Sequence, residues 1–200
     1  GAQPVFLQPE VDERLGIAMG LTEEKLARAI AAHPEAKALA CVYPTYYGVT
    51  FDLARIAALV HAHDMLLLVD EAHGPHLRFS EALPPQAIDC GADMAAQSTH
   101  KILGAMTQAS MLLVKGVRVD RERVREAASL LQSTSPNQLL LASLDIARLQ
   151  MAENGRETVG RAVRLAERLR RAINAIDGLW SFGPEYMDHP GATGLDATKI

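Results

Sequence analysis

The stretch Leu66-Leu67-Leu68-Val69-Asp70-Glu71-Ala72-His73-Gly74 decides the fold class of this chain. It begins with a continuous apolar run, which is typical of a strand covered on both faces in a parallel sheet. A second short strand is expected over 93–97, and it leads into Ser98-Thr99-His100-Lys101. Because the carboxyl ends of parallel strands meet at one edge of a sheet, we expect Asp70 and Lys101 to lie close together there.

A carboxylate beside an amine at such an edge is the pair that a pyridoxal phosphate enzyme needs. The amine bonds the cofactor aldehyde, and the carboxylate keeps the pyridine nitrogen protonated so that the ring can accept electrons. Lysine is rare in this chain, with five lysines among the twenty basic Lys and Arg residues. Lys101 is therefore the predicted cofactor lysine and Asp70 its predicted partner.

Composition sets the broad class of the protein. With 200 residues, 48% of them hydrophobic, the chain can bury a core and is expected to form one domain with part of a second. The formal net charge of -4 argues against a nucleic-acid partner. No leader is evident at 1–5, and the apolar run over 65–69 is too short to cross a membrane, so a cytoplasmic protein is expected. Cys41 and Cys90 are expected to be buried free thiols.

Strands and helices are predicted to alternate through the first three quarters of the chain. The expected strands are 38–43, 65–70, 93–97 and 109–114, and the expected helices are 22–33, one beginning after Asp52, 84–90, 137–152 and 158–176. A break at Asn154-Gly155 and a new strand after Gly178 are also expected. The pattern predicts an α/β fold, a three-layer sheet with helices on both faces over 1–153, followed over 154–200 by a linking helix and the start of a small α+β domain.

Two other kinds of site compete for the same residues. Asp70-Glu71-Ala72-His73 after an apolar strand is also the magnesium motif of helicase-type ATPases, but the chain has no Gly-x-x-x-x-Gly-Lys-Ser/Thr loop to hold a nucleotide. Four histidines are close in sequence, at positions 61, 63, 73 and 76, and could suggest a metal site. We expect the first two to be exposed on a helix, and no metal ligand is predicted.

Hydroxyl groups near the lysine are candidates for binding a phosphate. Ser98 and His100 flank the lysine turn, although local turn capping would also explain the serine. The cluster Ser133-Thr134-Ser135-Pro136 precedes a helix and could bind an anion or merely cap that helix.

Four segments of the chain together resemble the major domain of the Orn/Lys/Arg decarboxylase family. They are PTYYGVTFDL (44–53), LLVDEAHGPHLRFSEALPP (67–85), GADMAAQSTHKILGAMTQASMLLVKG (91–116) and TSPNQLLLASLDIAR (134–148). This family is part of the aspartate-aminotransferase-like superfamily of pyridoxal phosphate enzymes. The resemblance therefore implies the major-domain fold of these enzymes and pyridoxal 5'-phosphate as the cofactor.

The resemblance also implies roles for individual residues. Lys101 would carry the cofactor and Asp70 would face its ring nitrogen, while Ala72 would pack on the ring and His73 would lie near it. Ser98 and His100 would hold the phosphate, and His100 or Lys101 would deliver a proton. Ser133 or Thr134 would reach the phosphate in a neighbouring subunit, which implies a homodimer or a higher homo-oligomer.

The implied reaction is decarboxylation of a basic amino acid, arginine, lysine or ornithine, to the amine. An aminotransferase would share Lys101 and Asp70, so that alternative stays open. Family members carry a phosphate-binding turn and a ring-stacking histidine upstream of the part present here. The chain is therefore expected to be a fragment of a longer enzyme, or a catalytically incomplete relative that keeps the fold without its chemistry.

Overall fold

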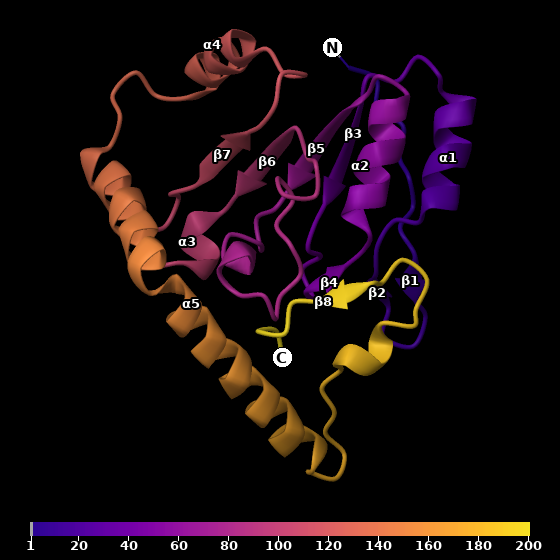
Figure 1. Ribbon diagram of the computed structural model, residues 1–200, viewed down its shortest axis with the longest axis vertical. Helices are drawn as coiled ribbons and strands as arrows, with labels where there is room; N and C mark the ends of the chain where they lie inside the picture. Colours follow the sequence, from indigo (N-terminus) through magenta and orange to yellow (C-terminus); the bar gives the residue numbers. More distant parts are fainter. Residues whose placement is uncertain (1) are drawn as a thin grey trace.

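The computed structural model describes residues 2–200 and is built around a four-stranded sheet (Figure 1). The spatial order is β3-β5-β6-β7, in which the first three strands are parallel and β7 is antiparallel to β6. The bounds of these strands are β3 (Ala38–Val42), β5 (Leu66–Asp70), β6 (Met94–Gln97) and β7 (Met111–Val114). All four predicted strands are confirmed, and Asp70 lies at the carboxyl edge, between Val42 and Ala96.

Two helices precede β3 and β5 as predicted. Helix α1 (Glu23–Ala32) begins after Thr22, and α2 (Leu53–Ala62) begins after Asp52; both cap side chains accept a hydrogen bond from the backbone of the first turn. The apolar stripe of α2 is buried with the sheet residues Leu67 and Val69 in one core. This face of the sheet is therefore well covered.

The residues that point to the other face of the same strands are more open. Val42 and Leu112 are each 49% exposed, whereas Leu67, on the covered face, is 0% exposed. Because side chains alternate along a strand, neighbouring residues differ in exposure throughout β3 and β5. A cavity of about 590 Å³ runs over the open face to its carboxyl edge.

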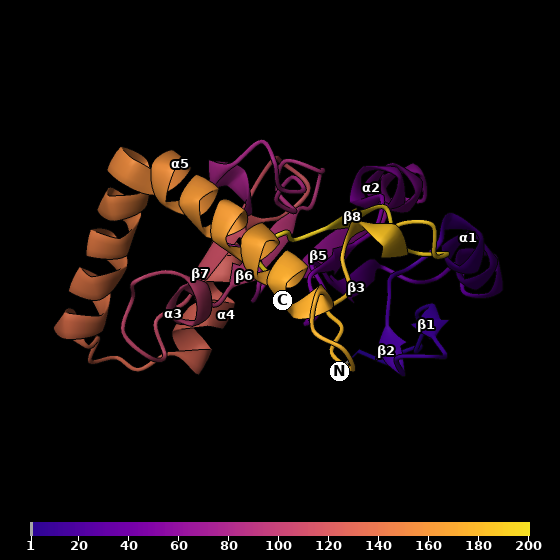
Figure 2. The same ribbon diagram turned by 90° about the horizontal axis from the view of Figure 1, so that it is seen from below.

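Residues 138–174 form one helix, where two helices were predicted. Helix α5 (Gln138–Asn174) is 37 residues long, begins after the capping residue Asn137 and runs along one side of the molecule (Figures 1 and 2). The predicted break at 154–155 is wrong because Gly155 lets the helix pack closely: a Cβ there would lie 2.7 Å from Cδ1 of Phe79. The division into domains at residue 153 stays a prediction.

Several short elements differ from the prediction or were not predicted. The region 84–90 forms no helix: residues 84–86 are irregular, 87–90 form a turn, and the Ala87 N–H binds a side chain from another loop. A strand was predicted directly after Gly178, but the chain first forms the 3₁₀ helix η2 (Pro184–Tyr186). The elements not predicted are β1 (Val11–Asp12), β2 (Ile17–Ala18), β4 (Val49–Thr50), η1 (Leu77–Phe79), α3 (Thr99–Ile102), α4 (Arg121–Leu131) and β8 (Gly194–Leu195).

The strand β8 positions the end of the chain near the predicted site. It pairs antiparallel with β4, the short strand that follows β3 along the chain, so Gly194 lies opposite Thr50. The segment after β8 therefore returns to the carboxyl edge of the sheet (Figure 1). Across residues 2–200, no helix has both the length and the apolar character needed to cross a membrane. The cytoplasmic location stays a prediction.

Candidate active site

Lys101 extends from a single helical turn that follows β6. Ser98 is the cap of this turn, and its carbonyl accepts a hydrogen bond of 3.0 Å from the Lys101 N–H. The Ser98 side chain makes no capping hydrogen bond, and the buried Thr99 hydroxyl has no partner in the described part of the chain. Of these two hydroxyl groups, that of Ser98 lines a cavity and is free to bind a ligand.

The cavity on the open face brings together four of the predicted site residues. Asp70, Ala72, Ser98 and Lys101 all line it. The Asp70 carboxylate is exposed at the strand end, where its Oδ1 accepts a 3.0 Å hydrogen bond from the Ala72 N–H. The structure therefore places a carboxylate, an amine and a free hydroxyl on one cavity, as the sequence predicts.

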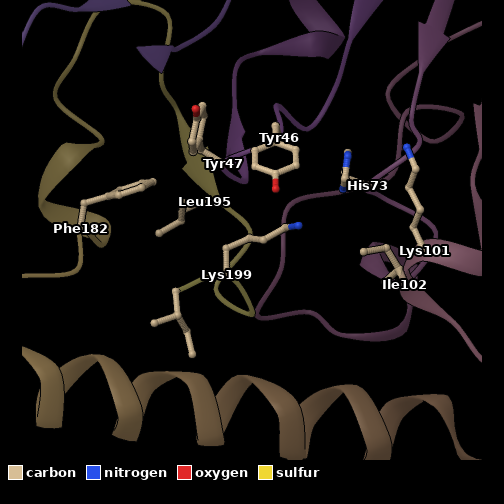
Figure 3. Close-up of a pocket in the computed structure, with 9 residues that line it drawn as sticks. Tyr46, Tyr47, His73, Lys101, Ile102, Phe182, Leu195 and Lys199 are labelled. Carbon is tan, nitrogen blue, oxygen red and sulfur yellow. The ribbon is translucent and has the colours of Figure 1, made fainter. Parts of the chain in front are cut away.

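A second cavity, of about 370 Å³, is also lined by Lys101 (Figure 3). Tyr46, His73, Lys101 and Lys199 line it, and the two lysines enter from opposite sides with His73 between them. The His73 ring packs edge-on against Tyr46 at 5.3 Å between centroids, and Lys199 Nζ lies 5.9 Å from the Tyr46 ring centre. Lys101 is therefore shared by both cavities.

The surroundings of His73 lower the pKa of its imidazole and so favour the neutral form. Burial lowers its pKa most, and the positive charges of Lys199 and Lys101 lower it further. Its Nδ1 is buried and has no hydrogen-bond partner among residues 2–200. An unpaired buried nitrogen is energetically costly, and the described residues provide no partner for it.

Sequence reasoning missed a buried pair, His76 and Asp196, that lies close in sequence to residues of the second cavity. His76 Nε2 lies 3.1 Å from Oδ2 of Asp196, and the Thr198 hydroxyl donates to Oδ1 of Asp196 at 2.7 Å. Burial opposes the charge of Asp196, but the contact with His76 lowers its pKa overall. The pair joins the loop after β5 to the segment after β8. Its members are 120 residues apart, and no local spacing signals such a contact.

Glu71 has a structural role. Its side chain is fully buried and accepts hydrogen bonds from the Ala87 N–H at 2.6 Å and from Gln97 Nε2 at 2.7 Å. Burial raises the pKa of Glu71 to about 7, against the smaller opposing effect of these two bonds. A carboxylate held in this way cannot reach a nucleotide or an attacking water, which argues against the ATPase alternative.

Three predicted site residues lie away from both cavities. His100 Nδ1 is 2.9 Å from the Ala109 carbonyl oxygen, so this nitrogen carries a proton and donates to the backbone. Ser133 and Thr134 are exposed in the loop between α4 and α5, and neither is among the lining residues of the two cavities. The phosphate roles of these three residues stay predictions.

The histidines that are close in sequence do not form one cluster. His61 Nε2 lies 2.9 Å from Asp93, whose carboxylate also accepts the Leu67 N–H, and His76 pairs with Asp196. Within residues 2–200, no group of three or more His, Cys, Asp or Glu side chains could hold a metal ion.

Relatives of known name match the whole chain. It is 48% identical over 200 residues to an arginine decarboxylase of Halalkalibacterium halodurans and 44% identical to one of Bacillus subtilis; each match covers 100% of this chain and 41% of the relative. A lysine decarboxylase of Hafnia alvei is 28% identical over 90% of the chain. The chain thus spans about two-fifths of the length of the arginine decarboxylases that it matches.

Solved structures confirm the fold class. Lysine decarboxylase A from Pseudomonas aeruginosa has a TM-score of 0.72 and 28% sequence identity. The match covers 95% of this chain and 29% of the Pseudomonas chain. The constitutive lysine decarboxylase of Escherichia coli has a TM-score of 0.71 and 25% sequence identity. The match covers 93% of this chain and 29% of the Escherichia coli chain. These neighbours confirm a sheet with helices on both faces. The family model for the Orn/Lys/Arg decarboxylase major domain matches residues 1–192, and the chain therefore belongs to this family of pyridoxal phosphate-dependent enzymes.

Proposed function

We propose that the protein containing this chain is a pyridoxal phosphate-dependent decarboxylase of a basic amino acid. The observation that carries the proposal is the position of Lys101 at the carboxyl edge of the sheet, where its side chain lines two cavities. One cavity also holds Asp70 and Ser98, and the other holds His73. A lysine that faces a cofactor on one side and a substrate on the other would have this arrangement.

The residues of the larger cavity fit the cofactor. The Asp70 carboxylate would face the ring nitrogen and keep it protonated, and Ala72 would lie against the ring. The Ser98 hydroxyl, which makes no capping hydrogen bond, would bind the phosphate. The Lys101 amine would hold the aldehyde carbon. When bound, pyridoxal phosphate supplies an electron sink for the bond that breaks.

The remaining polar groups near the lysine have different proposed roles. The lowered pKa of His73 favours its neutral form and its Nδ1 is unpaired, so it would orient the ring or the substrate without adding charge. For delivery of a proton to the substrate carbon, Lys101 is better placed than His100, because Lys101 lines both cavities and His100 already donates to the Ala109 carbonyl. We propose Lys101 as the proton donor.

Among the basic amino acids, we propose arginine as the substrate. The support is the higher identity to proteins named arginine decarboxylase, at 44–48%, than to the lysine decarboxylase of Hafnia alvei, at 28%. The amine product would be agmatine. An aminotransferase would release a keto acid in its place, so analysis of the products separates the two reactions.

The first experiment treats the longest natural form of the protein with pyridoxal phosphate and borohydride, followed by peptide mass mapping. We expect a pyridoxyl group on Lys101 and none at that position in Lys101→Ala. The intact protein is then assayed with arginine, lysine and ornithine for release of carbon dioxide and amine. Absence of the Lys101 adduct in a folded protein would refute the cofactor assignment and support a catalytically incomplete relative.

We also propose a homo-oligomer whose contact includes α4 and the first half of α5. Large apolar side chains are mostly exposed there, namely Leu130, Leu131, Leu139, Leu141 and Ile146. Exposed large apolar side chains are typical of a surface that a partner covers, and the Ser133-Thr134 loop lies between these residues in the sequence. In sedimentation velocity, we expect Leu131→Glu with Leu139→Glu to favour monomers, while Val117→Glu at another exposed apolar site leaves the assembly unchanged.

A further inference from the structure

We propose that Lys199 is the receptor for the α-carboxylate of the substrate, in the smaller cavity beside Lys101. This inference rests on the proposed function and names a residue to which neither the sequence analysis nor the family resemblance assigned a role. It starts from the position of Lys199, which extends into the cavity opposite Lys101 (Figure 3).

The chemistry of an α-amino acid limits where its carboxylate can bind. The amine and the carboxylate are attached to one carbon, so a substrate whose amine reaches Lys101 must place its carboxylate within a few ångströms of that residue. The smaller cavity shares Lys101 with the cofactor cavity and is therefore the neighbouring space. A cation on its wall is the expected partner for a carboxylate.

Lys199 is the side chain of this cavity that can provide that cation. The described lining residues include two lysines, one histidine and no aspartate or glutamate. Lys101 is committed to the cofactor, and the lowered pKa of His73 favours its neutral form. Asp196 is nearby in sequence, but it is fully buried and engaged with His76. The positive charge of Lys199 therefore faces a cavity whose lining includes no aspartate or glutamate side chain.

The backbone around Lys199 is held from several sides. The Asp196 N–H donates to the Gly48 carbonyl at 2.7 Å, and the Arg170 guanidinium donates to the Lys199 carbonyl. Gly48 has φ +85°, and a Cβ there would lie 2.7 Å from the Lys199 side chain, so the glycine leaves room for the lysine stem. A receptor for a reacting group must be positioned in this way, because catalysis depends on the orientation of the substrate.

A different explanation is that Lys199 only packs over the Tyr46 ring, or that it binds the cofactor phosphate. A packing role predicts no preference for ligands with a carboxylate. A phosphate role predicts weaker retention of pyridoxal phosphate when the charge is removed. Ligands with and without the carboxylate, together with the affinity for the cofactor, separate these explanations from the proposal.

The test uses the longest natural form of the protein and the variants Lys199→Gln, Lys199→Arg and Lys37→Gln. Lys37 is an exposed lysine outside both cavities and serves as the matched control. Borohydride mapping comes first: an unmodified Lys101 in the unaltered protein refutes the proposed function itself. With the adduct present, the first change in the visible spectrum after rapid mixing gives the apparent dissociation constants of arginine and of agmatine, which lacks the carboxylate.

We expect Lys199→Gln to raise the dissociation constant of arginine about 10- to 100-fold, because one charge-assisted hydrogen bond is lost. The dissociation constant of agmatine should change less than about twofold. Lys199→Arg should recover most of the arginine affinity, and Lys37→Gln should behave like the unaltered protein. Equal changes for both ligands, no change for either, or a loss of cofactor affinity in Lys199→Gln would each overturn the proposal.

A second readout needs neither turnover nor a variant. In the borohydride-reduced protein, whose Lys101 is blocked, reductive methylation followed by peptide mapping reports the accessibility of each lysine. We expect arginine to protect Lys199 and agmatine not to protect it, while Lys37 is methylated equally in both. Equal protection of Lys199 by the two ligands would contradict a carboxylate contact.

Discussion

The two faces of the central sheet are made from alternating residues of the same strands, and they differ in what they do. On the covered face, Leu67 and Val69 are buried under α2 and make up the core. On the open face, the neighbouring positions end at Asp70 and border the cavity that Lys101 also lines. The buried core lies on one face and the candidate active site at the edge of the other, so substitutions one residue apart should have different consequences.

The largest expected effect is on activity, at the open face. Asp70→Asn removes the negative charge but keeps the oxygen that accepts the Ala72 N–H, so the fold should be retained. We expect the decarboxylation rate of the full protein to fall about 10²- to 10³-fold, the usual cost of removing a group that stabilises developing charge. The free energy of unfolding should change by less than about 0.5 kcal/mol.

Asp64→Asn is the matched control for this prediction. Asp64 is an exposed aspartate in the turn before β5, with φ 54°, which asparagine tolerates. Steady-state rates and urea unfolding of both variants test the comparison. A loss of stability in Asp70→Asn equal to its loss of activity would show that the open edge also holds the fold together.

The second prediction concerns the covered face. Leu67→Ala should lower the free energy of unfolding of the 200-residue chain by about 2 to 5 kcal/mol, since a fully buried leucine leaves a cavity. Leu112→Ala, on the open face, should cost less than about 1 kcal/mol because the side chain is half exposed. Urea denaturation of the two variants measures the difference. Similar costs would mean that the two faces contribute equally to stability.

The third prediction uses Glu71, which follows Asp70 but is fully buried. Its pKa rises from 4.5 in an unfolded chain to about 7 in the folded protein, so between these values the folded state binds more protons. Stability therefore falls as pH rises from about 4.5 to about 7, by about 3 kcal/mol from this group, and is flat above.

Glu71→Gln should remove this pH dependence. Its amide can still accept the Ala87 N–H and donate to Gln97 if the Gln97 amide turns over. Urea midpoints of the variant and the unaltered protein at pH 5 and pH 8 provide the measurement, and the difference between the two proteins isolates Glu71 from other titrating groups. Parallel pH profiles would show that Glu71 is not the source.

The smallest expected effect extends the comparison to α5. Gly155→Ala should destabilise the protein by about 1 to 3 kcal/mol, because the new Cβ meets the Phe79 ring. Gly160→Ala, five residues later, meets only the end of the Arg164 side chain at 3.4 Å and should stabilise the protein by up to about 1 kcal/mol through helix propensity. Thermal unfolding distinguishes them, and equal shifts would contradict a close contact at Gly155.

Local signals in the sequence were sufficient for the sheet and for part of the site. Continuous apolar runs identified β3 and β5, and the capping residues Thr22 and Asp52 identified α1 and α2, because these signals act over a few residues. The rule that parallel strands end at one edge placed Asp70 with Lys101. The same rules failed at Asn154-Gly155, where a local breaker signal is overridden by packing against η1.

The sequence by itself determined the α/β class and the placement of Asp70 and Lys101 on one cavity, since both follow from apolar periodicity and from residues at strand ends. Only the tertiary structure decided that Glu71 is buried, that His76 pairs with Asp196, and that Lys199 enters the cavity beside Lys101. These contacts join residues up to about 120 positions apart, and pairing of β4 with β8 creates the last two. Distance along the chain carries no information about such pairs, so packing alone sets them.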